Sequence, residues 1–262
     1  MKRKIKSLMA ILFVVVLAFG TVGITMAGNL GVEDAGGNED EIIFGSQTKE
    51  DGYIGTEMPD AIGENATETD YYIESVDQFN SFQAISKTNN FAGITIHLAA
   101  NVALDDAFEG IGSAEVPFAG TFDGHGYAIT KLSSTANGLF VAVEGATIQK
   151  LVIGGAKLTA SEAANAGILA NIANGATVDK VIISGSKITA NIAGAMFGKV
   201  SGDVTITNST VRRLVVSSAT AVDFVGATEE GATVTTVNCA VVNSYAKDAN
   251  GEMTFVNCSV LK

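Results

Sequence analysis

Asp123 and His125 are the residues of this chain whose types and spacing most suggest chemistry. They stand two positions apart in Phe-Asp-Gly-His-Gly, and a carboxylate beside an imidazole can transfer protons as acid and base. The same segment suits a tight turn, in which Gly124 and Gly126 take unusual backbone angles and Asp123 accepts backbone N–H groups. We expect the turn, and therefore a structural role for Asp123, Gly124 and Gly126.

Cleavage of a polysaccharide needs more side chains than this pair. A glycosidase needs two carboxylates that face each other across a cleft, and a lyase needs a base beside bound calcium. Candidates exist by type only, and they do not recur at a regular spacing: Asp105, Asp106, Asp123, Asp179, Lys180, Arg212 and Arg213. We therefore expect no catalytic residues, no cofactor-binding residues and no metal ligands, so that the protein is not an enzyme.

Cysteines and asparagines recur in similar contexts toward the C-terminus. Cys239 and Cys258 each follow an Asn, in VNCAVV and VNCSVL. If the two stack in adjacent coils about 4.8 Å apart, they could form a disulfide; two stacked buried thiols are the alternative. We expect Asn208, Asn238 and Asn257 to form a structural ladder of turn residues joined by their side-chain amides.

The elements that must position these residues repeat along the chain. Short runs of Val, Ile and Thr alternate with glycine turns, and the marker glycines lie 30, 27 and 29 residues apart: Gly145, Gly175, Gly202 and Gly231. A period in the high twenties with only strand content indicates a solenoid of stacked coils. Because parallel crossovers are overwhelmingly right-handed, we predict an all-β fold, a right-handed parallel β-helix of about six coils over residues 94–262.

Three segments precede the repeats. Residues 1–27 combine a basic start with an apolar run and are typical of a signal peptide, with an uncleaved anchor as the alternative. Residues 28–70 are strongly acidic and predict a flexible linker. Residues 71–93 carry apolar side chains at helical spacing after an N-cap at Ser75, and predict a helix that caps the N-terminal end of the solenoid.

Composition restricts the partners. A formal net charge of −12 would repel nucleic acid and anionic membranes, so neither is expected as a partner. Membrane contact is expected only through the N-terminal segment, if it is retained. The leader predicts a secreted or cell-surface protein.

Residues 69–216 also resemble a known family, the bacterial GLUG-repeat proteins of the pectate-lyase-like β-helix superfamily. The likeness rests on FDGHGYAI at residues 122–129 and on Gly138-Leu139-Phe140, although Val141 stands where a second glycine is usual. The resemblance implies a surface or secreted binding module of adhesin type, and it carries no general catalytic motif.

We therefore expect a non-catalytic binding module that contacts an extracellular protein or glycan and uses no cofactor. Two alternatives stay open. One is a small polysaccharide lyase or glycoside hydrolase, and the other is a structural spacer or self-associating surface component.

Overall fold

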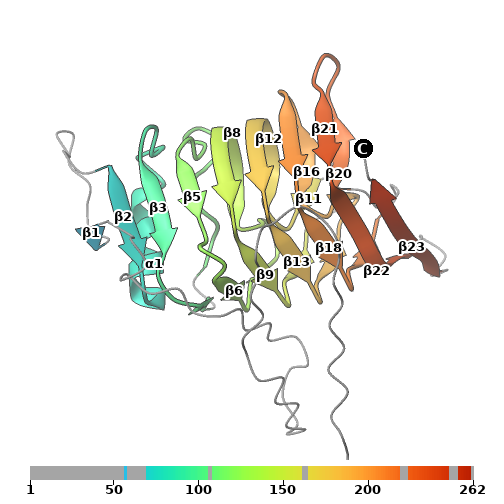
Figure 1. The fold of residues 1–262 in the computed structure, drawn as a ribbon, viewed down its shortest axis with the longest axis horizontal. Helices are drawn as coiled ribbons and strands as arrows, with labels where there is room; N and C mark the ends of the chain where they lie inside the picture. Colours follow the sequence, from blue (N-terminus) through green and yellow to red (C-terminus); the bar gives the residue numbers. More distant parts are fainter. Residues whose placement is uncertain are drawn as a thin grey trace, which may run out of the picture.

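The chain forms a parallel β-solenoid of about six turns, which confirms the predicted fold class (Figure 1). The structure is a computed structural model that describes residues 56–57, 69–105, 108–160, 165–218, 224–247 and 253–260, the first and last of these for the backbone alone. The expected signal peptide and most of the expected linker lie outside the described residues. Within the described part of the chain, no helix is long and apolar enough to cross a membrane.

One wall of the solenoid, here called wall 1, is a parallel sheet with one or two strands from every coil. Its order is β1 (Thr56–Glu57), β2 (Asp70–Ile73), β3 (Thr95–Leu98), β5 (Thr121–Asp123), β8 (Phe140–Gln149), β12 (Ala170–Asp179), β16 (Phe197–Val200) and β20 (Val225–Thr228). Alongside these, β17 (Val204–Thr207) pairs with β12 and with β21 (Val234–Val237). Successive coils therefore place equivalent residues side by side, in register.

Two further walls belong to one second sheet that turns a corner. Wall 2 holds β4 (Val102–Ala103), β6 (Ala128–Thr130), β9 (Val152–Gly154), β13 (Ile182–Ser184) and β18 (Thr210–Arg212). Wall 3 holds β7 (Ser133–Ser134), β10 (Lys157–Thr159), β14 (Lys187–Thr189) and β19 (Val215–Ser217). Strand β22 (Cys239–Lys247) runs through both walls, pairing first with β18 and then with β19. A small separate sheet pairs β11 (Asn165–Gly167) with β15 (Ile192–Gly194).

In four successive coils, the corner between walls 1 and 2 is made by one residue in the left-handed region. Lys150, Lys180, Asn208 and Asn238 follow wall 1 strands and have φ between 50° and 55°. Left-handed backbone is tolerated best by Gly and Asn, so a Lys here adds local strain. A second corner, between walls 2 and 3, uses the same device at Gly155, Gly185, Arg213 and Asn243.

A small polar residue follows several corners and points inward. The hydroxyl of Ser209 donates to Thr207 O (2.8 Å) and accepts from Val181 N in the previous coil (3.0 Å). Ser186 and Ser244 make the equivalent pair of bonds at the second corner. These bonds satisfy backbone groups that the sharp turns would otherwise leave unpaired in the interior.

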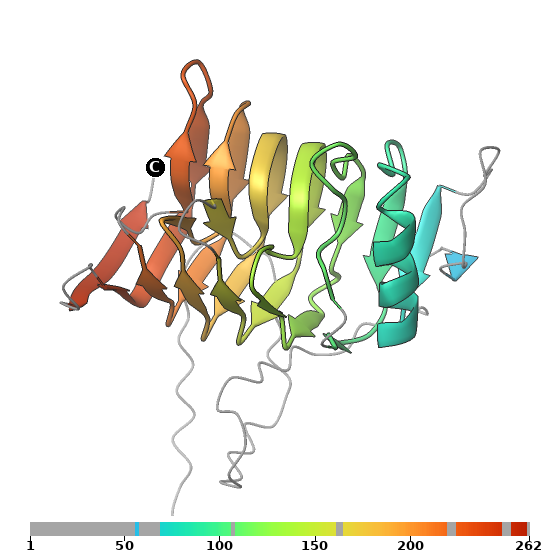
Figure 2. The ribbon, with the colours of Figure 1, turned by 180° about the vertical axis from the view of Figure 1, so that it is seen from behind.

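Helix α1 (Val76–Ile85) completes the first coil in place of a strand. Ser75 is its N-cap, with a hydroxyl that accepts from Gln78 N (3.2 Å), as predicted. Figure 2 shows α1 on the side of the solenoid opposite β2 and β3. Its buried face packs Phe82 against Phe91, Phe118 and Phe122 at centroid distances of 5.0–6.0 Å, and this aromatic cluster closes the N-terminal end of the core.

The solenoid begins and ends differently from the expected boundaries. Strand β2 pairs with β3 in parallel, so wall 1 starts before the helix and before residue 94. At the other end, β23 (Met253–Val260) pairs with β22 in the antiparallel direction. A strand that reverses direction needs only a short connection, whereas another parallel coil needs a full crossover.

Candidate functional site

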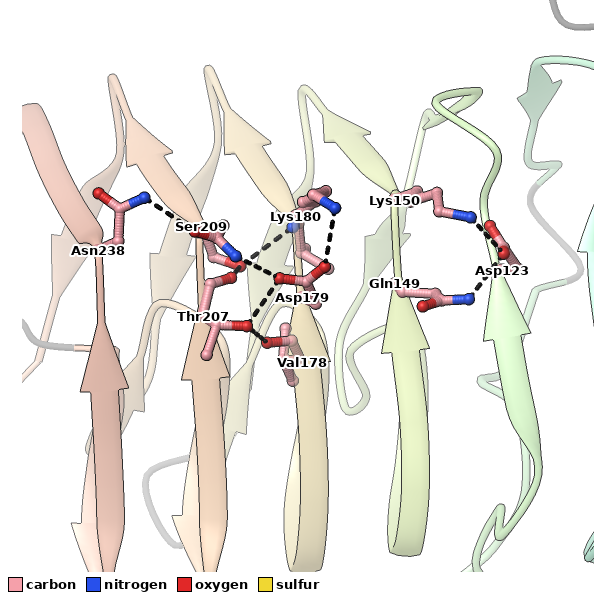
Figure 3. Close-up of polar contacts among 11 residues, drawn as sticks. Asp123, Gln149, Lys150, Val178, Asp179, Lys180, Thr207, Ser209 and Asn238 are labelled. Carbon is pink, nitrogen blue, oxygen red and sulfur yellow. Dashed lines mark hydrogen bonds and ion pairs between the residues drawn. The ribbon is translucent and has the colours of Figure 1, made fainter. Parts of the chain in front are cut away.

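Polar side chains form an outward-facing column where the wall 1 strands end. The strand register places equivalent residues side by side in successive coils: Tyr72, His97, Asp123, Gln149, Asp179 and Thr207. The residues after this column form the first corner, so their side chains can reach the column as well. Figure 3 shows the polar contacts from Asp123 to Asn238.

Asp123 is the buried member of the column, with a side chain only 6% exposed. Its Oδ1 accepts the backbone N–H of His125 (2.9 Å), and its Oδ2 accepts from Gln149 Nε2 (2.7 Å) and Lys150 Nζ (3.0 Å). Burial alone would raise the pKa of this carboxyl. The His125 N–H and the Lys150 ammonium favour the charged form more strongly, so the net pKa is lowered.

The FDGHG segment is a turn, but its two glycines act differently. Gly126 has a φ of 85°, as expected of a turn glycine, whereas the other left-handed residue is His125 at 49°. The expectation of an unusual φ at Gly124 was wrong. A Cβ at Gly124 would collide with the backbone of Lys150 and Leu151, so this glycine is required by the close approach of the next coil.

Two histidines stack on this turn. His97 Nδ1 lies 2.8 Å from His125 Nε2, and the two ring centroids are 5.1 Å apart. His97 Nε2 lies 3.0 Å from Asp70 Oδ1, and His125 Nε2 lies 3.9 Å from Asp123 Oδ1. The imidazoles are mostly enclosed, with side chains 12% and 20% exposed. The coils thus collect two imidazoles and two carboxylates at one end of wall 1.

Burial and nearby charges shift the pKa values of Asp70 and His125 in this cluster. The hydrogen bond from His97, followed by that from Thr69, lowers the pKa of Asp70. Burial lowers the pKa of His125, against the opposing effect of Asp123. The arrangement therefore favours ionised carboxylates beside a neutral His125 imidazole near neutral pH.

Asp179 is a second hub of the column. It accepts hydrogen bonds from Thr207 Oγ1 and Asn208 Nδ2, both at 2.7 Å, and lies 3.4 Å from Lys180 Nζ. Asn238 Nδ2 continues the ladder by donating to Asn208 Oδ1 (2.8 Å; Figure 3). The expected ladder member Asn257 lies outside the described side chains.

The other candidate catalytic residues lie in separate settings. Asp105 accepts from Asn80 Nδ2 of helix α1 (2.9 Å), and Asp106 lies outside the described residues. Arg213 makes the second corner, and its Nη2 lies 3.5 Å from Ser184 Oγ. Burial, followed by the charge of Arg213, lowers the pKa of Arg212. Among these candidates, Asp179 and Lys180 contact each other directly, as an ion pair at the corner between walls 1 and 2.

Cys239 and Cys258 do not stack as adjacent parallel coils would require. Because β23 is antiparallel to β22, Cys258 faces Val241, and Cys239 faces Val260. The side chain of Cys258 lies outside the described set. Cys239 is a free, buried thiol whose Sγ lies 3.3 Å from Val237 O. The Ser209 hydroxyl makes the equivalent contact with Thr207 O one coil earlier. Burial raises the pKa of this thiol.

Wall 3 presents a basic outer face on this acidic protein. Lys157 and Lys187 lie side by side in adjacent coils and form one row. A second row runs from Thr159 and Thr189 through Ser217 to Lys247. The sequences of these strands contain no Asp or Glu: SS, KLT, KIT, VVS and YAK. Lys157 and Thr159 also line an open cleft of about 760 Å³, together with Lys87, Glu109, Ser133 and Asn137.

His97 is the site residue that sequence reasoning missed. A signal for it existed, because the chain has 2 histidines, and His97 and His125 are 28 residues apart, about one coil. Residues one coil apart in a solenoid lie side by side. The coil period therefore predicts that the two imidazoles meet.

Comparisons with known proteins find a structural likeness but no family. No family model matches the chain, and no curated protein matches it. A crystal structure described as "a putative immunoglobulin A1 protease from Bacteroides ovatus" is similar, with a TM-score of 0.45, 15% identity and coverage of 68% of each chain. The fold assignment rests on the strand pairing described above, and the GLUG resemblance stays a prediction.

Proposed function

We propose that this protein is a secreted or cell-surface, non-catalytic binding module of adhesin type. Its ligand is an extracellular glycan or protein that carries negative charge. The observation that carries the proposal is the outer face of wall 3, with its rows of lysine and threonine and the adjoining cleft. A parallel sheet holds such side chains at a fixed spacing, which suits a long repetitive ligand.

The two central lysines of wall 3 support the proposal that the ligand is anionic. Lys157 and Lys187 lie directly opposite each other, and like charges in that position destabilise a sheet. Among the described residues, no carboxylate forms an ion pair with either lysine. A sulfate or carboxylate placed between the two ammonium groups would relieve their repulsion, while threonine hydroxyls nearby can hydrogen-bond to sugar or backbone groups.

The proposal predicts that binding depends on Lys157 and Lys187. The double variant Lys157→Ser and Lys187→Ser copies Ser133, which occupies the same register position one coil earlier. Hydrogen bonds to charged groups contribute about 1.5–3 kcal/mol each, so we expect binding to weaken by at least about tenfold. A glycan array followed by titration of the best ligand measures this.

A matched control removes the same charge from wall 1. Lys180→Asn copies the corner residue Asn208, and Lys199→Ser removes the partner of Glu229. The control should bind as the wild type does, and equal losses in both double variants would contradict a wall 3 site. Turnover of pectic or host glycans that is lost in Asp123→Ala would contradict the non-catalytic part.

A specific observation favours one alternative, a self-associating surface component. Strand β21 pairs only with β17 among the described strands, and Val237 at its end is 39% exposed. An open strand edge can pair with another chain. Sedimentation velocity that shows a monomer throughout the micromolar range would exclude this alternative, and concentration-dependent assembly without ligand would favour it.

A further inference from the structure

We propose that His97, His125 and Asp123 form a binding site for a divalent transition-metal ion of the zinc type, with Asp70 as the orienting partner of His97. The three side chains are brought together by strands β3 and β5 and by the turn that follows β5. The proposal is independent of the wall 3 ligand.

The ligand atoms have nearly the spacing that a zinc ion requires. One ring nitrogen from each of His97 and His125 and a carboxylate oxygen of Asp123 all lie within 4.8 Å of one another. Two ligands at usual zinc distances are about 3.3 Å apart in a tetrahedron and never more than about 4.2 Å apart. The His125–Asp123 distance of 3.9 Å lies within this limit but must shorten slightly for a tetrahedral ion, and the two imidazole nitrogens, now 2.8 Å apart, must separate slightly.

Asp70 prepares His97 to act as a ligand. An ionised carboxylate only accepts hydrogen bonds, so the 3.0 Å contact places a proton on His97 Nε2. In a neutral imidazole the lone pair is then on Nδ1, the nitrogen that faces His125. Metal-binding histidines commonly donate their other N–H to a carboxylate in this way, which fixes both the tautomer and the ring orientation.

Asp123 can serve a metal ion through Oδ1. This oxygen lies toward His125, whereas Oδ2 accepts from Gln149 and Lys150. The Lys150 ammonium opposes a second cation nearby. The Lys150 side chain is 42% exposed, so it can turn toward solvent when an ion enters.

The donor set decides the class of ion. Imidazole nitrogen suits zinc, nickel, copper and cobalt, whereas calcium and magnesium prefer sites made of oxygen ligands. Two imidazoles and one carboxylate leave room for water in a fourth position, as in zinc sites with three protein ligands.

The test is isothermal titration of the full-length chain with ZnCl₂, with CoCl₂ absorption as a second readout of tetrahedral geometry. We expect one tight Zn²⁺ per chain and no comparable Ca²⁺ binding.

His97→Ala and His125→Asn should abolish the tight site, and Asn keeps the left-handed turn at position 125. Asp70→Asn should weaken binding by about 10–100-fold, as expected for loss of an orienting carboxylate. Lys150→Gln should strengthen binding because the opposing charge is removed.

Two control variants separate this site from other metal-binding groups. Cys239→Ser removes the buried thiol and copies Ser209, and Lys180→Asn changes the same corner in a later coil. Both should bind Zn²⁺ as the wild type does, with unchanged circular dichroism. Tight Zn²⁺ binding that survives in folded His97→Ala and His125→Asn proteins would overturn the proposal, as would the absence of tight binding to the wild type.

Discussion

At the scale of single residues, the wall 1 column shows how a solenoid joins one coil to the next. The backbone ladder already pairs the strands, and the column side chains from His97 to Thr207 add bonds to neighbouring coils. Asp179 is the clearest case, because it holds Thr207 and Asn208 of the following coil. Such bonds also fix the left-handed corner residues, whose backbone conformation is unfavourable by itself.

Asp179→Ala should therefore destabilise the protein. Loss of the two 2.7 Å hydrogen bonds predicts a decrease of about 1–2 kcal/mol in the free energy of unfolding, measured by urea denaturation at pH 7. The Lys180 contact adds little because that side chain is 46% exposed and the ion pair is screened by solvent. As the control, Lys180→Ala should cost clearly less than Asp179→Ala.

The Asp179 contribution should also depend on pH in a defined direction. Burial opposes the charged form, but the bonds from Asn208 and Thr207 outweigh it, so the folded pKa lies below the ordinary 3.8. The unfolded chain then binds more protons in this range, and stability rises with pH. The gap between the wild type and Asp179→Ala should be full above pH 3.8 and should close as pH falls through the folded pKa. A gap that widens on acidification would contradict this.

At the scale of elements, α1 buries apolar side chains in the core of the first coil, as strands do in the other coils. Its face is narrow, with Phe79, Phe82 and Ile85 buried, and it closes a core that is unusually aromatic at this end. The residues Phe91, Phe118, Phe122 and Phe140 continue the cluster into the first turns. Farther along, Ile148, Val178 and Ile206 occupy the register position of Phe122.

Phe82→Ala should be the most damaging helix substitution. Phe82 contacts four other phenylalanines and is fully buried, so we expect a loss of about 3–5 kcal/mol, measured by chemical denaturation. Ser75→Ala, which removes only the N-cap bond, should cost about 0.5–2 kcal/mol. If the two variants lose the same stability, the helix does not close the core as described.

At the scale of the whole molecule, burial is uneven along the axis. Strands β8 and β12 in the middle alternate between buried and outward residues, whereas β20 and β21 have no fully buried residue. The opposite wall at this end is covered by β23. The C-terminal end of wall 1 is therefore less enclosed than its middle.

Hydrogen exchange should follow this gradient. Amides of β20 and β21 should exchange faster than those of β8 and β12, because local opening there exposes little apolar surface. Mass spectrometry of exchanged peptides measures the rates, with β22 as the internal control under its antiparallel cover. Equal protection of β21 and β12 would indicate that another chain or segment covers the edge.

The sequence by itself determined the solenoid, its period and the capped helix at Ser75. These features depend on local patterns: strand-forming runs, glycines at a fixed spacing, and apolar residues at helical intervals. A single strand has no such pattern, so β2 was not predicted: Asp70 was assigned to the linker and residues 71–73 to the helical capping segment, although Tyr71 and Ile73 are buried. The reversal of β23 was also missed, because its strand composition fits either direction of pairing.

Only the tertiary structure decided which polar residues meet. The FDGHG turn was predicted correctly as a turn, yet Asp123 and His125 gained their partners from other coils: Gln149 and Lys150 for Asp123, and His97 for His125, with Asp70 bonded in turn to His97. Register sets these contacts, and a coil that is longer or shorter by one residue would move each side chain to the opposite face of its strand. The chemistry suggested by two residues in sequence is thus distributed over four coils in space, where stacking, and not sequence proximity, brings the groups together.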